Sequence, residues 1–114
     1  MALRVVVDLF SGRPNPGWTL DVANEAEFRR RLELARTAPS RDSRLLPGLG
    51  YRGLVVRASE EENAPELCRI HGESIVVSGS SRLDAGRQFE RWLLSTGKGV
   101  LEPSLFEMVK LDVG

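Results

Sequence analysis

Apolar residues gather near the start of the chain in a short run that is typical of a buried strand. Residues 3–10 read LRVVVDLF and contain three consecutive valines. β-Branched side chains favour extended backbone, and the run is too short for a typical helix, so it predicts a strand. Residues 51–57 and 67–77 predict strands for the same reason. The second of these is interrupted at His71 and Gly72, where the glycine indicates a bulge or a tight bend.

A segment in the first third of the chain has apolar residues at helical spacing. Phe28, Leu32 and Ala35 recur at intervals of four and three, which places them on one stripe of a helix. Asp21 and Asn24 can each cap its first turn, because a short polar side chain accepts a hydrogen bond from a free backbone amide. The pattern therefore predicts a first helix that begins at one of these two residues.

Residues 83–96 predict a second helix, because Phe89, Trp92 and Leu93 form another apolar stripe. Asp84 lies at its start, where an acidic side chain stabilises the amide end of a helix. The end of the chain, residues 105–113, is also rich in apolar side chains. This last segment predicts a strand, with a short helix as the alternative.

Together these elements follow the order strand, helix, strand, strand, helix, strand. Two βα units joined through a hairpin give an antiparallel sheet with two helices on one face. A length of 114 residues suits one domain. We therefore expect an α+β domain over residues 1–114 with a ferredoxin-like arrangement. Residues 39–50, rich in proline, glycine and serine, predict a long surface connection.

The charges of the chain are balanced, with 16 Lys and Arg against 16 Asp and Glu. Nucleic-acid binders usually carry net positive charge, so we expect no nucleic-acid partner. No apolar run approaches the roughly 20 residues of a spanning helix, and residues 1–10 lack the features of a signal peptide. We expect no membrane interaction and a cytoplasmic location. The basic residues are 14 Arg and 2 Lys, a bias typical of a GC-rich bacterial genome or, alternatively, of phosphate and carboxylate recognition.

The chain has few residues of the types that act as nucleophiles or bind metal ions. Cys68 is the only cysteine and His71 the only histidine, which excludes an internal disulfide and a cysteine-based metal site within one chain. Their odd spacing on an extended strand sends the two side chains to opposite faces, which disfavours a Cys–His nucleophilic pair. No catalytic motif is recognisable. We expect no metal and no cofactor, and the sequence favours a protein that is not an enzyme.

The most distinctive segment is the loop SGRPNPGW at residues 11–18. Its two prolines restrict the backbone and leave few conformers, so the loop can hold side chains still. Arginine and aromatic residues are enriched at protein interfaces. Our leading hypothesis is a small accessory or protein-interaction domain that binds another protein through this loop, with the indole at the surface. The expected binding residues are Arg13, Asn15, Trp18, Tyr51 and Arg52.

Asp8 supports an alternative hypothesis. It lies within an apolar run, where a buried acid needs a partner that Arg13 or Arg52 could supply. The protein would then bind a small anionic molecule, or be an enzyme subunit, with Asp8 as acid or base and Arg13, Asn15 and Arg52 as orienting groups. In the simpler interpretation Asp8 lies on the solvent face of a strand or accepts hydrogen bonds from loop amides. An uncovered sheet edge also allows a homodimer.

Overall fold

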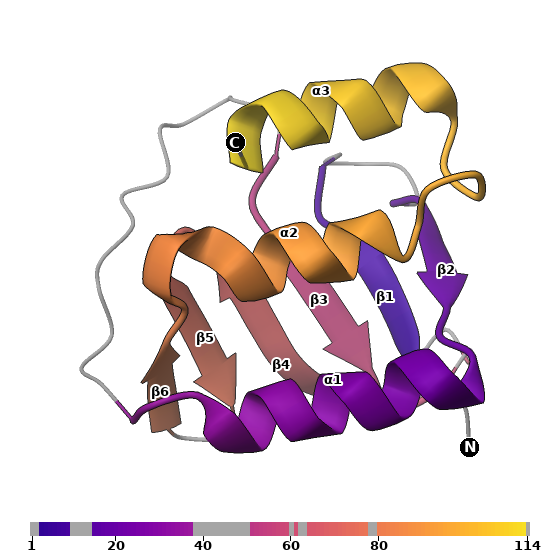
Figure 1. Cartoon of the computed structure of the whole chain (residues 1–114). Coiled ribbons are helices and arrows are strands. Elements are labelled where there is room, and N and C mark those ends of the chain that lie inside the picture. Colours follow the sequence, from indigo (N-terminus) through magenta and orange to yellow (C-terminus); the bar gives the residue numbers. More distant parts are fainter. Residues whose placement is uncertain are drawn as a thin grey trace.

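The fold is a six-stranded antiparallel sheet with three α-helices (Figure 1). It is seen in a computed structural model that describes residues 3–9, 15–37, 51–59, 61, 64–77 and 80–113. The elements in chain order are β1 (Arg4–Val7), β2 (Gly17–Thr19), α1 (Val22–Leu34), β3 (Leu54–Arg57), β4 (Glu66–His71), β5 (Ser74–Val77), β6 (Ser80–Leu83), a 3-10 turn η1 (Ala85–Arg87), α2 (Gln88–Ser95) and α3 (Pro103–Val113).

The strands lie in the order β2-β1-β3-β4-β5-β6, and each neighbouring pair is antiparallel. Val5 of β1 pairs with Trp18 of β2 on one side and with Val56 of β3 on the other. Residues paired in this way point to the same face of a sheet. This register gathers the apolar side chains of the central strands on one face.

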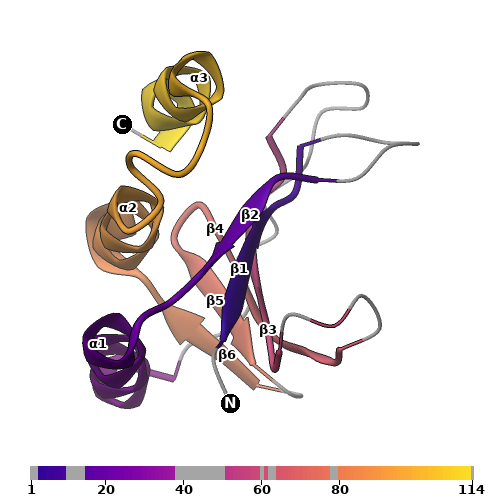
Figure 2. The same ribbon diagram turned by 90° about the vertical axis from the view of Figure 1, so that its right-hand side faces the viewer.

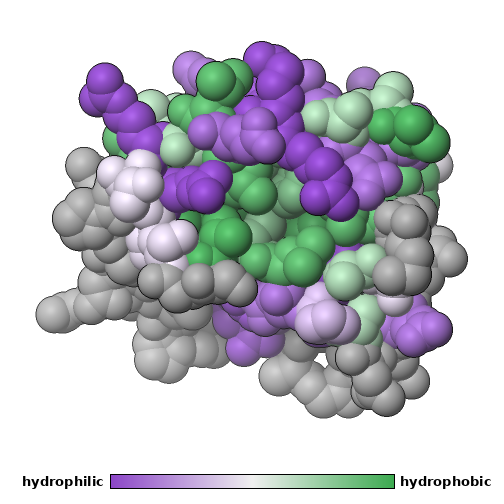
Figure 3. Space-filling view, turned by 90° about the horizontal axis from the view of Figure 1, so that it is seen from below, coloured by the Kyte–Doolittle hydropathy of each residue, from purple (hydrophilic) through white to green (hydrophobic). Residues whose placement is uncertain are grey.

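All three helices lie on that face, as Figure 2 shows from the side. The core between the two layers includes Phe28 of α1, Leu93 of α2 and Ile75 of β5, each at most 2% exposed. No described helix or strand covers the opposite face of the sheet. Seen from the α1 end, the described residues show apolar surface in the middle of the molecule with hydrophilic side chains beside it (Figure 3).

Asp21 decides where α1 begins. Its side chain accepts a hydrogen bond from the backbone amide of Asn24 at 2.7 Å, and α1 starts at Val22. Of the two caps that the sequence allows, the structure therefore uses the earlier one. Asp84 has the same role for α2, because its two carboxylate oxygens accept from the amides of Phe89 at 2.8 Å and Glu90 at 3.0 Å.

Replacing Asp21 with alanine is expected to lower the free energy of unfolding by about 1 kcal/mol, because an amide of the first turn loses its acceptor. Urea unfolding followed by circular dichroism measures the change. Asp21→Asn, which keeps a capping oxygen, should remain close to the original protein. Equal losses in the two variants would contradict the capping role.

The tail of the chain is α3, so the predicted last strand is wrong and the alternative is confirmed. Phe106, Val109 and Val113 recur at intervals of three and four and are buried. Pro103 is the first residue of the helix, a position that needs no backbone N–H. Apolar content alone suited both structures, and the spacing of these three residues was the signal that distinguished them.

The α+β class and the antiparallel sheet are confirmed, but the strands do not follow the ferredoxin-like order. That arrangement returns a last strand to the sheet after the second helix, whereas here no described strand follows α2, and β3 to β6 pair in chain order. β2 and β6 were not predicted as strands. The break at Gly72 is the turn between β4 and β5, where glycine adopts a φ of 64°.

The longest described helix is α1, with 13 residues. Within the described ranges, no helix combines the length and the apolar character needed to cross a membrane.

Candidate binding face

Trp18 does not lie at the surface. Its side chain is 3% exposed, and its indole Nε1 donates a hydrogen bond to Thr96 Oγ1 at 2.7 Å. A Cβ atom added at Gly97 would lie 2.8 Å from the indole ring, so the glycine backbone covers it. The expectation that Trp18 presents its indole to a partner is therefore wrong. The physical reason is its register with Val5, which turns the ring toward the helices.

Asn15 closes the end of the β1–β2 connection. Its Oδ1 accepts a hydrogen bond from the backbone amide of Leu9 at 3.0 Å, and its surface is half-buried. Pro16 contributes to the same closure, because its carbonyl accepts from the amide of Val7 at 2.9 Å. Arg13 lies outside the described residues. Asn15 and Pro16, in the described part of the expected binding loop, are therefore tied to the end of β1 by hydrogen bonds.

Tyr51 is half-buried, and its hydroxyl belongs to a polar cluster around Glu90. Its hydroxyl donates a hydrogen bond to Glu90 Oε2, and its ring packs edge-on against His71 with 5.6 Å between centroids. Burial, followed by the negative charge of Glu90, raises the pKa of Tyr51 far above its usual value. The phenol therefore stays protonated as a donor. The hydroxyl of Tyr51, one of the expected binding residues, is therefore occupied by Glu90 within the protein.

Glu90 is fully buried at the centre of this cluster. Arg87 donates to both of its oxygens, from Nε at 2.8 Å and from Nη2 at 3.1 Å. Arg87 Nη1 also donates to the carbonyl oxygen of Asp112 at 2.8 Å, which ties α2 to the end of α3. No signal in the sequence separated Glu90 from an exposed acid. Its enclosure favours a structural role for the cluster.

Arg87 holds its side chain in this cluster at the expense of backbone strain. Its φ is 58°, in the left-handed region, where a residue with a side chain is destabilised by roughly 1–2 kcal/mol. The hydrogen bond to Glu90 raises the pKa of Arg87, so the guanidinium remains charged. The two-pronged interaction with a buried carboxylate offsets the strain.

Asp8 lies on the open face, the side of the sheet away from the helices. Its Oδ1 accepts from Arg52 Nη2 at 3.0 Å and its Oδ2 from Arg69 Nη1 at 2.6 Å. Arg69 Nε donates in turn to Glu66 at 3.3 Å. The expected partnership of Asp8 with Arg52 is confirmed. Arg69 was missed, because only the pairing of β3 with β4 brings it to Asp8.

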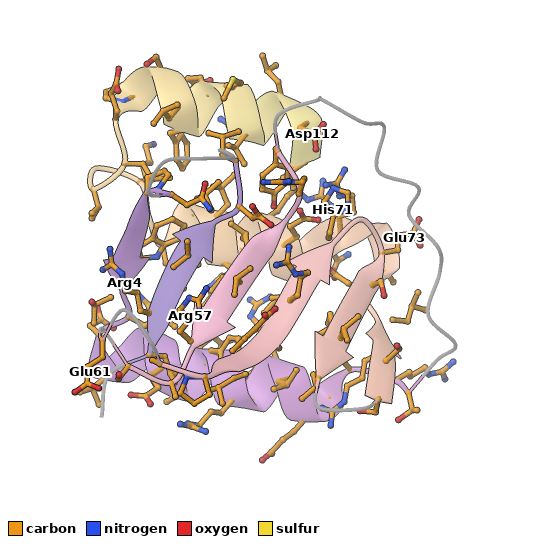
Figure 4. All side chains as sticks on the ribbon, turned by 180° about the vertical axis from the view of Figure 1, so that it is seen from behind. Arg4, Arg57, Glu61, His71, Glu73 and Asp112 are labelled. Atoms are coloured by element: carbon orange, nitrogen blue, oxygen red, sulfur yellow. The ribbon has the colours of Figure 1, made fainter. Side chains whose placement is uncertain are left out.

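Arg4 and Arg57 form a second charged pair on the open face. They lie directly opposite each other in the register of β1 and β3, and Figure 4 shows them on neighbouring strands at the same end of the sheet. Arg57 donates to the carbonyl oxygen of Ala64 at 3.1 Å. Neither guanidinium forms an ion pair with a carboxylate of the described residues. Like charges in this position repel each other.

Cys68 and His71 do not form a catalytic pair. Burial, reinforced by the charge of Glu66, raises the pKa of the Cys68 thiol to about 12, which keeps it protonated at neutral pH. Cys68 pairs with Val56 on the helix-covered face, whereas the His71 ring contacts Tyr51. In the part of the chain that the structure describes, no three His, Cys, Asp or Glu side chains are grouped to hold a metal ion.

The fold and these contacts define a small α+β domain with helices on one face of its sheet and an arginine-bearing open face on the other. No protein-family model, no curated protein and no solved structure matches the chain. The functional argument therefore rests on the geometry of the chain itself.

Proposed function

We propose that the protein is a small protein-interaction domain that binds its partner through the open face of the sheet. The observation that carries this proposal is the one-sided arrangement of the helices, which leaves six strands with no described helix over their second face. A sheet face is broad and flat, as are most surfaces that bind another protein.

The side chains on this face suit a protein partner. Arg4, Arg57 and Arg69 project from three adjacent strands, and arginine is enriched at interfaces. Val76 of β5 pairs with Arg69 and is 43% exposed, which adds an apolar contact beside the charges. Mixed apolar and arginine contacts of this kind contribute much of the binding energy in protein complexes.

A hollow of about 320 Å³ lies on β4 and β5, next to the Asp8 bridge. Its lining includes Arg69, Leu67 and Val76. A cavity of this size accepts one or two side chains of a partner. A side chain of the partner that enters this hollow is shielded from water, as hot-spot residues of protein interfaces are.

Asp8 fits this proposal better than it fits catalysis. Both of its carboxylate oxygens accept hydrogen bonds from guanidinium groups, those of Arg52 and Arg69. An acid or base must direct an oxygen at the proton that it transfers. We therefore assign Asp8 the role of fixing the two arginines on the face, and we do not propose the alternative of an enzyme subunit.

The experiment is affinity capture from an extract of the source cells, quantified by mass spectrometry. Arg4→Gln/Arg57→Gln is expected to reduce recovery of the partner at least tenfold, because two interface arginines lose their contacts. Arg29→Gln/Arg30→Gln removes the same charge from α1 on the other side of the molecule and should leave recovery unchanged.

Val76→Asp supplies a second, independent test, since it places an acid in the apolar part of the face. Thermal unfolding of each variant verifies that the fold is intact. Recovery of the same partner by the original protein and by both open-face variants would overturn the proposal.

A further inference from the structure

A groove between α2 and α3 lies away from the open face of the sheet. The two helices pack side by side in both ribbon views (Figures 1 and 2). The groove has a volume of about 240 Å³, and the apolar part of its lining consists of Leu94, Phe106 and Val113. These three side chains are buried beneath it and form an apolar floor.

The rim of this groove is basic. Arg91, Lys98 and Lys110 line it together with Ser95, and its lining contains no acidic residue. The chain has only two lysines, and both of them are at this one groove. Neither lysine ammonium group forms an ion pair or hydrogen bond with another described residue. Two lysine ammonium groups therefore border a small apolar surface that has no carboxylate in its lining, while the guanidinium of Arg91 donates to the carbonyl oxygen of Gly86.

Helix dipoles account for only part of this arrangement. Lys98 follows the end of α2 and Lys110 lies in the last turn of α3, where a positive charge is favourable. The dipole favours a positive charge near the end of a helix, but it does not select one face of that helix. It does not explain why both lysines border the same groove.

We infer that this groove binds a small organic acid, with the hydrocarbon part on the apolar floor and the carboxylate between the basic side chains. The volume is below the range of about 300–1,000 Å³ that is usual for drug-sized ligands, so the hydrocarbon part is short. A bare anion would leave the floor unused, and a neutral molecule would leave the two lysine ammonium groups without a counter-ion among the groove residues. This inference is independent of the proposed partner binding, because it uses the opposite side of the molecule.

The test uses hexanoate as the probe and nuclear magnetic resonance of isotopically labelled protein as the measurement. Hexanoate is expected to shift the methyl resonances of Leu94 and Val113 and the amide resonances of Leu94, Phe106 and Val113 in a saturable way. 1-Hexanol has the same tail without the charge and should bind at least tenfold more weakly. Acetate has the charge without the tail and should leave these resonances in place.

Three variants separate the contributions of charge and floor. Lys98→Gln/Lys110→Gln should weaken hexanoate binding about tenfold and leave 1-hexanol binding unchanged, because two exposed ion pairs are lost. Lys98→Arg/Lys110→Arg keeps the charges and should retain binding. Ser95→Phe fills the groove from an exposed position and should abolish binding of both probes.

Both lysines are exposed, so their replacement leaves the core intact, and a thermal unfolding curve verifies this. The inference is overturned if hexanoate shifts no resonance of the groove, or if 1-hexanol binds as tightly as hexanoate. It is also overturned if the Gln variant binds hexanoate like the original protein.

Discussion

Trp18→Ala is expected to lower the free energy of unfolding by about 4 kcal/mol, because it removes a large buried ring and leaves a cavity. The indole lies between β1 and the start of the α2–α3 connection, where its Nε1 bonds to Thr96 and its face contacts Gly97. For a chain of this length the midpoint of thermal unfolding should fall by roughly 15 °C. Urea unfolding followed by tryptophan fluorescence from Trp92 and by circular dichroism measures the effect.

Two further variants show whether the loss comes from the core. Trp18→Phe keeps an aromatic ring and should lose about half as much, since it gives up the hydrogen bond and part of the buried surface. Leu111→Ala truncates an apolar side chain that is 82% exposed and should change stability by less than about 0.5 kcal/mol. A Trp18→Ala protein as stable as the original would show that the indole is not packed as described.

Glu90→Ala is expected to lower the free energy of unfolding by about 3 kcal/mol, because removal of one partner leaves a buried charge without its counter-ion. Arg87 loses the acceptor of two hydrogen bonds, and the Tyr51 hydroxyl loses its only described acceptor. Arg87 keeps its contacts with Asp112, which places the expected loss at the lower end of the usual range. Urea unfolding at neutral pH measures it.

Two control variants show whether the loss of stability comes from the hydrogen bonds of Glu90 or from the removal of an acidic side chain in general. Tyr51→Phe deletes one hydrogen bond and should lose about 1 kcal/mol. Glu107→Ala removes an exposed acid from α3 and should be nearly neutral. If Glu90→Ala proves as mild as Glu107→Ala, then the hydrogen bonds of Glu90 to Arg87 and Tyr51 do not stabilise the fold in solution.

The sequence alone suggested that Trp18 and Tyr51 bind a partner, whereas in the structure both contact other parts of the protein. Trp18 follows a proline-rich loop and suggested an exposed recognition residue, but its register opposite Val5 in the pairing of β1 with β2 directs it inward. A three-residue strand is too short to reveal its face by alternation. The partner of the Tyr51 hydroxyl was hidden for a related reason, since its acceptor Glu90 is 39 residues away in the sequence.

The polar part of the candidate site was partly predictable. Asp8 interrupts an apolar strand, which indicated an acid in need of a partner, and Arg52 is that partner. The second partner, Arg69, and the opposed Arg4 and Arg57 depend on which strands are neighbours. Strand order does not follow from local pattern, because pairing energies arise between segments far apart in the chain.

The sequence by itself determined the α+β class, the first helix with Asp21 and Asn24 as its two possible caps, and the break of the extended segment at Gly72. Each of these depends on spacing or conformation within a few residues. Tertiary structure alone decided the strand order, the inward direction of Trp18, the buried network around Glu90 and the meeting of both lysines at one groove. The physical reason is that burial and ion pairing depend on contacts between distant segments, which only the packed chain brings together.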